Sequence, residues 1–186
     1  LGLNGEWDNK RDTILPTLAH QTLQGQANWQ GSLDLHLYKG GHYYYDAQLT
    51  SPLSALALDL PAPYNKPAGR NWPLQVKISG NQDSSVINGS LNHEWQLQAD
   101  WSPEQKQFRR FWLDNQVIER SAGPRLPFSV SAILSEADFS AWLDWAKRWP
   151  ATGQKAVNQL FPDTGAIDLR VDKLHVSDQL WRDVRL

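Results

Sequence analysis

The sequence predicts a mainly β protein, built as a strongly curved antiparallel sheet of roughly ten strands. Apolar and polar residues alternate with a period of two in several segments, turn-forming residues separate these segments, and one segment alone has clear helical spacing. The short intervals between the segments favour antiparallel hairpins over parallel crossover units. Either an open groove or a sandwich-like arrangement is compatible with this pattern.

The alternation is clearest in six segments, and each predicts a strand with one apolar face. Their apolar stripes are Leu33, Leu35 and Leu37; Leu56, Leu58 and Leu60; Leu74, Val76 and Ile78; Leu91 to Trp101, with Leu97 and Ala99; Phe128 to Leu134; and Ile167 to Val171. Weaker strand candidates are Leu23–Trp29, Tyr43–Thr50, Phe108–Leu113 and Gln116–Arg120. Asn88-Gly89, which also begins a formal glycosylation sequon with Ser90, is interpreted as a hairpin turn.

One segment departs from the strand pattern and predicts a helix near residues 136–149. Ser135 and Asp138 have the spacing of a capping box, and apolar residues follow at helical spacing until Pro150 ends the pattern. A second, shorter helix is predicted near residues 154–160, between Gly153 and Pro162.

The composition excludes several classes of function. The chain has 186 residues and a net charge of −2, so it lacks the basic surplus that a nucleic-acid partner requires. Cysteine is absent, which removes disulfides, thiolate metal sites and cysteine nucleophiles. Methionine is absent even at position 1, and the last residues resemble an interrupted strand. We therefore expect residues 1–186 to form a single β-rich segment of a longer protein.

Signals for catalysis are poor, and we expect neither enzyme activity nor a cofactor. No two of the five histidines have a metal-binding spacing, and there is no nucleophile elbow or phosphate loop. Glu94 and Glu119 could form a carboxylate pair for glycoside hydrolysis, but nothing in the sequence selects them.

The predicted apolar face is larger than the predicted helix can cover. Ten strands at about 4.8 Å spacing form a sheet about 48 Å wide, whereas a helix of about 14 residues is about 21 Å long. The sheet must fold on itself, pack against another module or hold an apolar ligand. Candidate lining residues for a ligand are Leu33, Leu35, Leu37, Leu56, Leu58, Leu60, Leu74, Val76, Ile78, Leu97 and Ala99.

Two other functions remain open at this point. Ten tryptophans on a β scaffold are compatible with a carbohydrate-binding module, because indole rings stack well on sugars. A structural or partner-binding spacer with a closed core would have the same apolar stripes.

Three stretches of the chain resemble the YhdP branch of the AsmA-like proteins. They are the proline-rich stretch from Ser51 to Gly69 with Trp72-Pro-Leu74, the ending from Gly165 to Leu186, and Leu23 to Trp29 with Gly31 to Leu35. The proline-rich stretch is the most specific of the three, and together they touch most of the chain.

The resemblance implies a function that composition alone does not. Members of the family are large, non-enzymatic Gram-negative envelope proteins, anchored in the inner membrane and extending through the periplasm. Their β-sheet groove is expected to conduct phospholipid acyl chains toward the outer membrane. The partners implied for this chain are phospholipid acyl chains, neighbouring repeats of the parent protein and other envelope proteins, with no nucleic acid. No individual lipid-contacting residue is carried over from the family.

Overall fold

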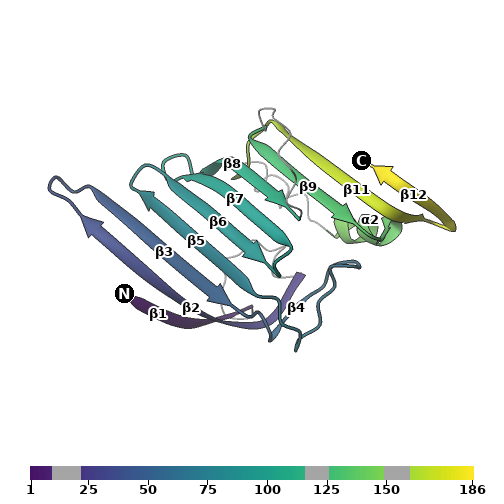
Figure 1. Cartoon of the computed structure of the whole chain (residues 1–186), viewed down its shortest axis with the longest axis horizontal. Coiled ribbons are helices and arrows are strands. Elements are labelled where there is room, and N and C mark those ends of the chain that lie inside the picture. The colour runs from purple at the N-terminus through teal and green to yellow at the C-terminus, as the bar shows by residue number, and fades with distance from the viewer. Residues whose placement is uncertain (10–21, 116–125, 149–159) are drawn as a thin grey trace.

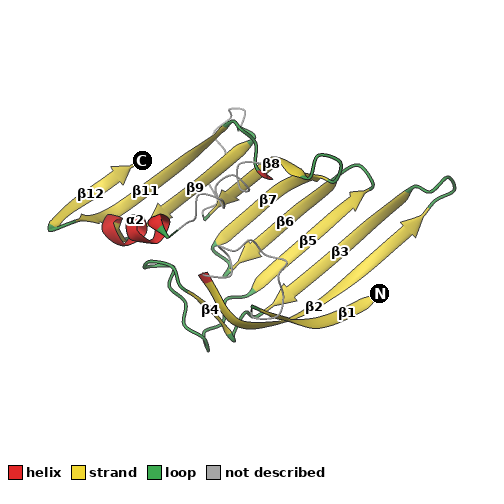
Figure 2. Ribbon diagram, turned by 180° about the vertical axis from the view of Figure 1, so that it is seen from behind, coloured by secondary structure: helices red, strands yellow, loops and turns green. Residues whose placement is uncertain are grey.

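The chain forms one large open sheet with a single helix among the residues that the structure describes (Figures 1 and 2). The computed structural model describes residues 1–9, 22–115, 126–148 and 160–186. Strand β1 at one edge and strand β12 near the other lie far apart, so the sheet does not close (Figure 1). The prediction of a mainly β protein with one clear helix is confirmed.

Twelve strands make up the sheet in the described part of the chain, two more than the approximate number expected. They are β1 (Gly2–Asp8), β2 (Leu23–Leu37), β3 (Tyr43–Ser51), β4 (Leu56–Leu58), β5 (Leu74–Asn81), β6 (Ser85–Leu91), β7 (Trp95–Ser102), β8 (Gln107–Asp114), β9 (Phe128–Leu134), β10 (Ala137–Asp138), β11 (Gly165–Val176) and β12 (Gln179–Arg185). The helix is α2 (Phe139–Lys147).

The sheet is mixed rather than wholly antiparallel. Strands β1, β2, β3, β5, β6, β7 and β8 are neighbours in that order, and every pairing among them is antiparallel. Strand β9 is parallel to both β8 and β11, and β10 is also parallel to β11. Parallel neighbours require a crossover, and α2 lies in the connection between β9 and β11. Period-two alternation specifies a strand but not the direction of its partner, so the sequence did not reveal these parallel pairs.

The hairpin turn between β6 and β7 lies four residues after the predicted one. Asn88 and Gly89 are inside β6, where Gly89 is paired with Leu97. The chain reverses instead at Asn92 and His93, which have φ angles of 54° and 58°. Two successive residues with positive φ are typical of a type I′ hairpin turn, and asparagine adopts this conformation more readily than most residues. The stripe from Leu91 to Trp101 is therefore divided between two strands.

Helix α2 begins later than the capping-box pattern indicated. Asp138 is its N-cap, and the Asp138 side chain accepts a hydrogen bond from the Ala141 backbone N–H at 3.0 Å. Ser135 is not the cap, because Ala137 and Asp138 first form β10 against Leu174 and His175. The second helix predicted near 154–160 and the weak strand at 116–120 lie essentially outside the described residues.

The proline-rich stretch between β3 and β5 is an ordered loop held by a buried lysine. Lys66 is 1% exposed, and its Nζ donates to the carbonyl oxygens of Leu53, at 2.7 Å, and of Leu56. Strand β4, within this loop, pairs with the first residues of β2. Burial lowers the pKa of Lys66, and the charge of Arg70 lowers it further. The loop is therefore tied both to itself and to the sheet.

The Asn115 side chain continues the sheet where strand β8 ends. Its Oδ1 accepts from the Ile133 backbone N–H at 2.8 Å, and its Nδ2 donates to the Ile133 carbonyl at 2.9 Å. The same Nδ2 donates to the Tyr64 hydroxyl at 3.3 Å. One carboxamide thus replaces a backbone partner for β9 and connects β9 to the proline-rich loop.

A cluster of buried core residues lies at one end of the sheet, beside α2. Its buried residues are Ala132, Leu134, Ala137, Val171 and Leu174, from β9, β10 and β11. Partly buried side chains packed against them include Tyr64, Trp95 and Trp142. Within the described ranges, no helix is both long and apolar enough to cross a membrane.

Replacing Lys66 is expected to remove a pH dependence of stability. The pKa of Lys66 is lower in the folded chain than the ordinary value of 10.5, so the unfolded chain binds more protons between those two values. The free energy of unfolding should therefore rise with pH toward 10.5, and Lys66→Met should flatten this rise. Urea denaturation at several alkaline pH values measures the slope. The exposed Lys77→Met is the matched control, and an equal flattening by Lys77→Met would contradict the assignment.

Replacing Asn115 is expected to weaken the junction between β8 and β9. Asn115→Ala leaves the Ile133 N–H and C=O without their side-chain partner, which should lower the free energy of unfolding by about 1–3 kcal/mol. Asn115→Asp keeps the acceptor for the Ile133 N–H but loses the donor, so it tests the two bonds separately. Urea denaturation and amide exchange at Ile133 measure the effect. Unchanged exchange protection in Asn115→Ala would show that the carboxamide does not support β9.

Candidate functional site: the apolar face of the sheet

The strand registers place apolar residues in continuous rows across the sheet. Directly opposite residues in neighbouring strands share a face, so the pairings can be followed from strand to strand. The first row is Leu35, Tyr45, Gly80, Ser85, Trp101 and Phe108. The second row is Leu33, Ala47, Ile78, Ile87, Ala99, Phe111, Phe128 and Gly165. The third row is Gly31, Leu49, Val76, Gly89, Leu97, Leu113, Val130 and Ile167.

These three rows define what we call the apolar face, and none of their residues carries a charge. The second and third rows cross eight strands, from β2 to β11, without interruption. In the first row Tyr45 and Ser85 are polar, but their oxygen atoms lie 2.7 Å apart and satisfy each other. The face therefore offers a long surface on which an apolar chain meets no charged side chain.

The opposite face is polar along the same strands. One of its rows is Gln30, Thr50, Gln75, Ser90, Gln96, Asp114, Ser131 and Asp168. Charged side chains on this face pair with each other, as Arg110 does with Asp100 and Arg185 with Asp168. The hydrogen bond from Arg185 lowers the pKa of Asp168. This division makes the sheet amphipathic over its whole width.

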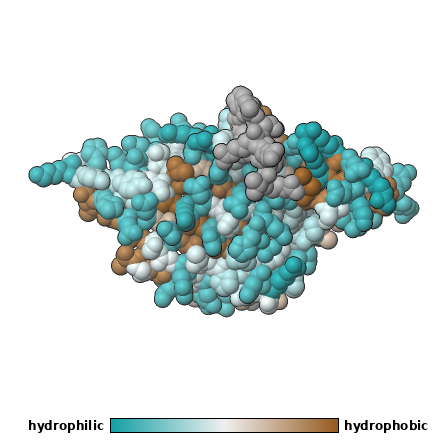
Figure 3. Space-filling model, in the orientation of Figure 1, coloured by the Kyte–Doolittle hydropathy of each residue, from teal (hydrophilic) through white to brown (hydrophobic). Residues whose placement is uncertain are grey.

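Coverage of the apolar face is uneven. Beside α2 the side chains are buried, whereas near the β2–β3 hairpin Leu35 is 53% and Leu37 is 76% exposed. Near the C-terminal edge Ile167 is 59% and Trp181 is 49% exposed. In the space-filling view, brown apolar residues are visible among hydrophilic ones over the part of the molecule that holds β2, β3 and β5 (Figure 3). Both ends of the face are therefore open among the described residues.

A cluster of aromatic rings covers part of the middle of the face. Phe161, from the chain preceding β11, contacts Phe108, Phe111 and Phe128 with ring centroids 5.4, 4.8 and 5.6 Å apart. Trp101 extends the cluster through Phe108, at 5.0 Å. A register shift between Asp100 and Trp101 allows Phe108 and Phe111 to share a face although they are three residues apart.

The structure brings most of the predicted lining residues onto this single face. Leu33, Leu35, Val76, Ile78, Leu97 and Ala99 are members of the three rows, and Leu37 and Leu74 extend the stripes of β2 and β5 on the same side. The other three lie outside these rows. Leu56, which is 4% exposed, and Leu58 are both in β4, and Leu60 is in the proline-rich loop. Tyr64, Phe108, Phe111 and Phe161 could not be predicted as lining residues from the sequence, because their grouping depends on a bulge and on contacts distant in sequence.

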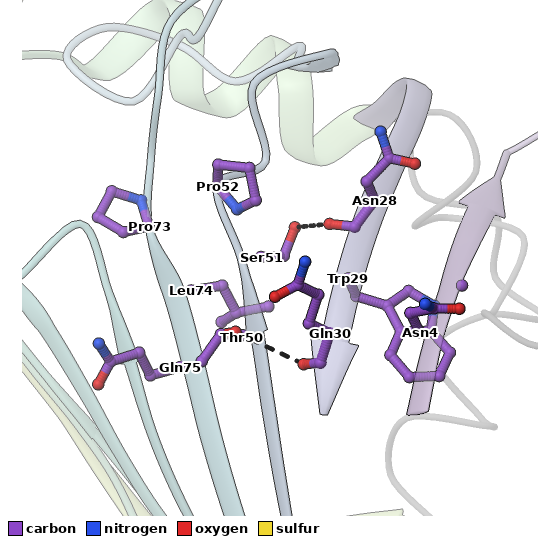
Figure 4. Close-up of a pocket in the computed structure, with 11 residues that line it drawn as sticks. Asn4, Asn28, Trp29, Gln30, Thr50, Ser51, Pro52, Pro73, Leu74 and Gln75 are labelled. Carbon is purple, nitrogen blue, oxygen red and sulfur yellow. Dashed lines mark hydrogen bonds between the residues drawn. The ribbon is translucent and has the colours of Figure 1, made fainter. Parts of the chain in front are cut away.

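An open pocket of about 690 Å³ lies where β3 ends and β5 begins, and Leu74 of the apolar face is one of its lining residues (Figure 4). Side chains from β1, β2, β3 and β5 line it, and none of its lining residues is charged. Ser51 Oγ donates to the Asn28 carbonyl at 2.7 Å, and Thr50 Oγ1 donates to the Gln30 carbonyl at 3.5 Å (Figure 4). Amides, hydroxyls and one indole at this rim suit a neutral ligand. Among the described residues, no group of three His, Asp or Glu side chains could hold a metal ion.

Comparison with known proteins gives one family over the entire chain. The family model described as "YhdP protein" matches residues 1–186. The intermembrane phospholipid transporter YhdP of Escherichia coli (strain K12) is 24% identical over 189 residues. That alignment covers 100% of this chain and 14% of the Escherichia coli protein, so the chain spans about one seventh of the length of this relative. No solved structure matches the chain.

The family match agrees with the resemblance found in the proline-rich stretch and in the ending from Gly165 to Leu186. The match extends over every described strand, including those that carry the apolar rows. The chain therefore belongs to the YhdP family.

Proposed function

We propose that this chain is a non-enzymatic segment of a periplasmic protein that conducts phospholipid acyl chains between the inner and outer membranes along its apolar face. One observation carries the proposal: charge-free rows run across eight strands and are exposed at both ends. A route for a lipid needs an inlet and an outlet, and a closed core has neither. The name of the Escherichia coli relative, a phospholipid transporter, supports the same cargo.

The physical basis is the transfer of methylene groups out of water. Each buried CH₂ group contributes about 0.8 kcal/mol, so a tail lying along the rows is stabilised over its whole length. Leucine, isoleucine, valine and alanine side chains line most of the second and third rows, without a charged group that would hold the cargo at one point. As an acyl chain moves along such a surface, each apolar contact that it loses is replaced by a similar one.

The lipid-contacting residues in this proposal are those of the apolar face. They include Leu33, Leu35, Leu37, Leu74, Val76, Ile78, Leu97 and Ala99 from the sequence analysis, with Leu49, Ile87, Leu113 and Val130 added by their register. Leu56, Leu58 and Leu60 support the proline-rich loop, through the pairing of β4 with β2 and through the loop itself.

The chain is proposed to act as one β-rich segment within a longer protein anchored in the inner membrane of a Gram-negative bacterium. Its alignment to only 14% of the Escherichia coli relative supports a position within a larger assembly. Neighbouring repeats of the parent protein, and other envelope proteins, are the partners proposed for the ends of the sheet. If the apolar rows continue into such repeats, the lipid route becomes longer and keeps the same kind of lining.

Carbohydrate binding is a second candidate, favoured by the pocket beside Trp29. Carboxamides from Asn4, Gln30 and Gln75 face the same open space as Pro52 and Pro73. Uncharged hydrogen-bonding groups beside an indole suit a neutral sugar. Quenching of tryptophan fluorescence by oligosaccharides, lost in Trp29→Phe, would support this candidate; no response would remove it.

A charge on the apolar face is expected to block acyl binding without unfolding the chain. Leu35→Asp introduces an ion that an acyl chain cannot solvate, and Leu35 is exposed enough to tolerate it. The affinity for a fluorescent C16 fatty acid should fall by about tenfold or more, equal to about 1.4 kcal/mol. Fluorescence titration measures affinity, and circular dichroism verifies folding.

His36→Asp is the matched control, because His36 is the next residue in β2 and lies on the polar face. It should leave fatty-acid affinity unchanged. Equal losses in both variants, or no uptake by the unaltered chain, would refute acyl binding by the apolar face.

A further inference from the structure

The apolar face has unequal width along the sheet, and the narrow part lies at β7, β8 and β9. We propose that the chain narrows there to a lane of three aliphatic residues between two aromatic walls, and that this lane admits linear acyl chains while excluding fused-ring hydrophobes. The inference rests on the proposed function and adds the class of hydrophobe that passes. The lane residues are Leu97, Leu113 and Val130, which are consecutive members of the third row.

The first wall is the aromatic cluster of Trp101, Phe108, Phe111, Phe128 and Phe161. Phe161 is the only member outside the sheet strands, and it rests on three other phenylalanine rings at centroid distances of 4.8 to 5.6 Å. Phe111 and Phe128 are also stacked, at 5.9 Å. The wall therefore rises above the sheet along the side of the lane formed by the first and second rows.

The second wall consists of Tyr64, Trp95 and Trp142, from three separate elements. Tyr64 lies 5.4 Å from Trp95 and 6.3 Å from Trp142, measured between ring centroids. The Tyr64 hydroxyl accepts a hydrogen bond from Asn115, and Arg148 pairs with Asp59 at 3.4 Å. The first bond connects the proline-rich loop to the end of β8, and the second connects it to the end of α2, so both place the second wall at the other side of the lane.

Strand geometry limits the lane to a single row of side chains. Residues two apart in a strand lie on the same face about 7 Å apart. On β7, Leu97 and Ala99 lie between Trp95 of the second wall and Trp101 of the first, and Ala99 is only 2% exposed, so Leu97 alone remains accessible there. On β8, Leu113 is two residues from Phe111 of the first wall. On β2 and β5, by contrast, three successive rows are available: Leu35, Leu33 and Gly31 on β2, and Gly80, Ile78 and Val76 on β5.

The shape of the lane favours one class of hydrophobe. A linear methylene chain has the width of a single aliphatic row and can lie across Leu97, Leu113 and Val130 with both walls in place. A fused ring system is wider and requires displacement of a wall ring from its packed neighbours, which loses dispersion contacts on both sides. We therefore expect the wide region near β2–β5 to accept both classes, and the lane to accept only the linear one.

Photolabelling of the full chain with two probes tests the lane. One probe is a C16 fatty acid with a terminal diazirine, and the other is a sterol with a diazirine on its ring system. Adducts are mapped by mass spectrometry to peptides from β2–β5 and from β7–β9. The fatty acid should label both regions, and the sterol should label β7–β9 at least about tenfold less than the fatty acid does, which corresponds to about 1.4 kcal/mol.

Two variants change the lane in opposite directions. Leu113→Trp fills it and should remove fatty-acid adducts from β7–β9 while leaving those on β2–β5. Phe161→Ala lowers the first wall and should allow the sterol to label β7–β9. Val86→Trp, a similar enlargement at an exposed position on the polar face of β6, is the matched control and should leave labelling of both regions intact. Val130→Trp replaces Leu113→Trp if circular dichroism shows that Leu113→Trp is unfolded.

The outcomes distinguish a failure of the lane from a failure of the proposed function. Absence of fatty-acid adducts on both regions of the unaltered chain would refute the proposed function itself. Fatty-acid adducts on β2–β5, together with strong sterol labelling of β7–β9 in the unaltered chain, would overturn the lane alone. Persistence of fatty-acid adducts on β7–β9 in the folded lane-filling variant would also overturn it.

Discussion

The structure depends on strand registers that keep the apolar stripes of β2, β3, β5, β6, β7, β8, β9 and β11 on the same face. Because side chains alternate with a period of two, a slip of one residue in any pairing would turn that strand's stripe to the opposite face. The pairing of Leu33 with Ala47, and of Ala47 with Ile78, shows the alignment at the start of the sheet. The pairing of Phe111 with Phe128 preserves it across the first parallel junction. An amphipathic sheet results only because all of these registers agree.

Two local features of the backbone, a hairpin turn and a register shift, keep the apolar side chains of neighbouring strands on the same face. The turn at Asn92 and His93 uses two positive φ angles to reverse the chain while keeping Leu91 opposite Trp95. The register shift between Asp100 and Trp101 brings Phe108 onto the same face as Phe111, despite a spacing that would otherwise separate them. Without that shift, Phe161 would lose one of the three rings on which it rests.

The elements that cover the apolar face are small compared with the sheet. Their placement decides which parts of the face are buried and which are exposed. Helix α2, Tyr64 and Phe161 shield the part near β7 to β11, whereas Leu35 and Leu37 at one end and Ile167 at the other remain exposed. Tyr64 reaches its position because Lys66 ties the proline-rich loop and Asn115 binds the Tyr64 hydroxyl. The hydrogen bonds made by Lys66 and Asn115 thus help to decide how much of the apolar surface stays open. In this member of the YhdP family, the proposed lipid route depends on this division between covered and open surface.

The sequence by itself determined the strands, the single clear helix and the apolar stripes, because period-two and helical spacing are local properties of the chain. Leu33, Val76 and Leu97 could be placed on apolar strand faces in this way, and the resemblance in the proline-rich stretch indicated the family. Only the tertiary structure decided the parallel placement of β9 and β11, the exchange of the predicted cap Ser135 for Asp138, and the grouping of Tyr64, Trp95 and Trp142. These features depend on which distant segments meet and in which register. Local alternation carries no information about that choice, since the same stripe fits a parallel or an antiparallel partner equally well.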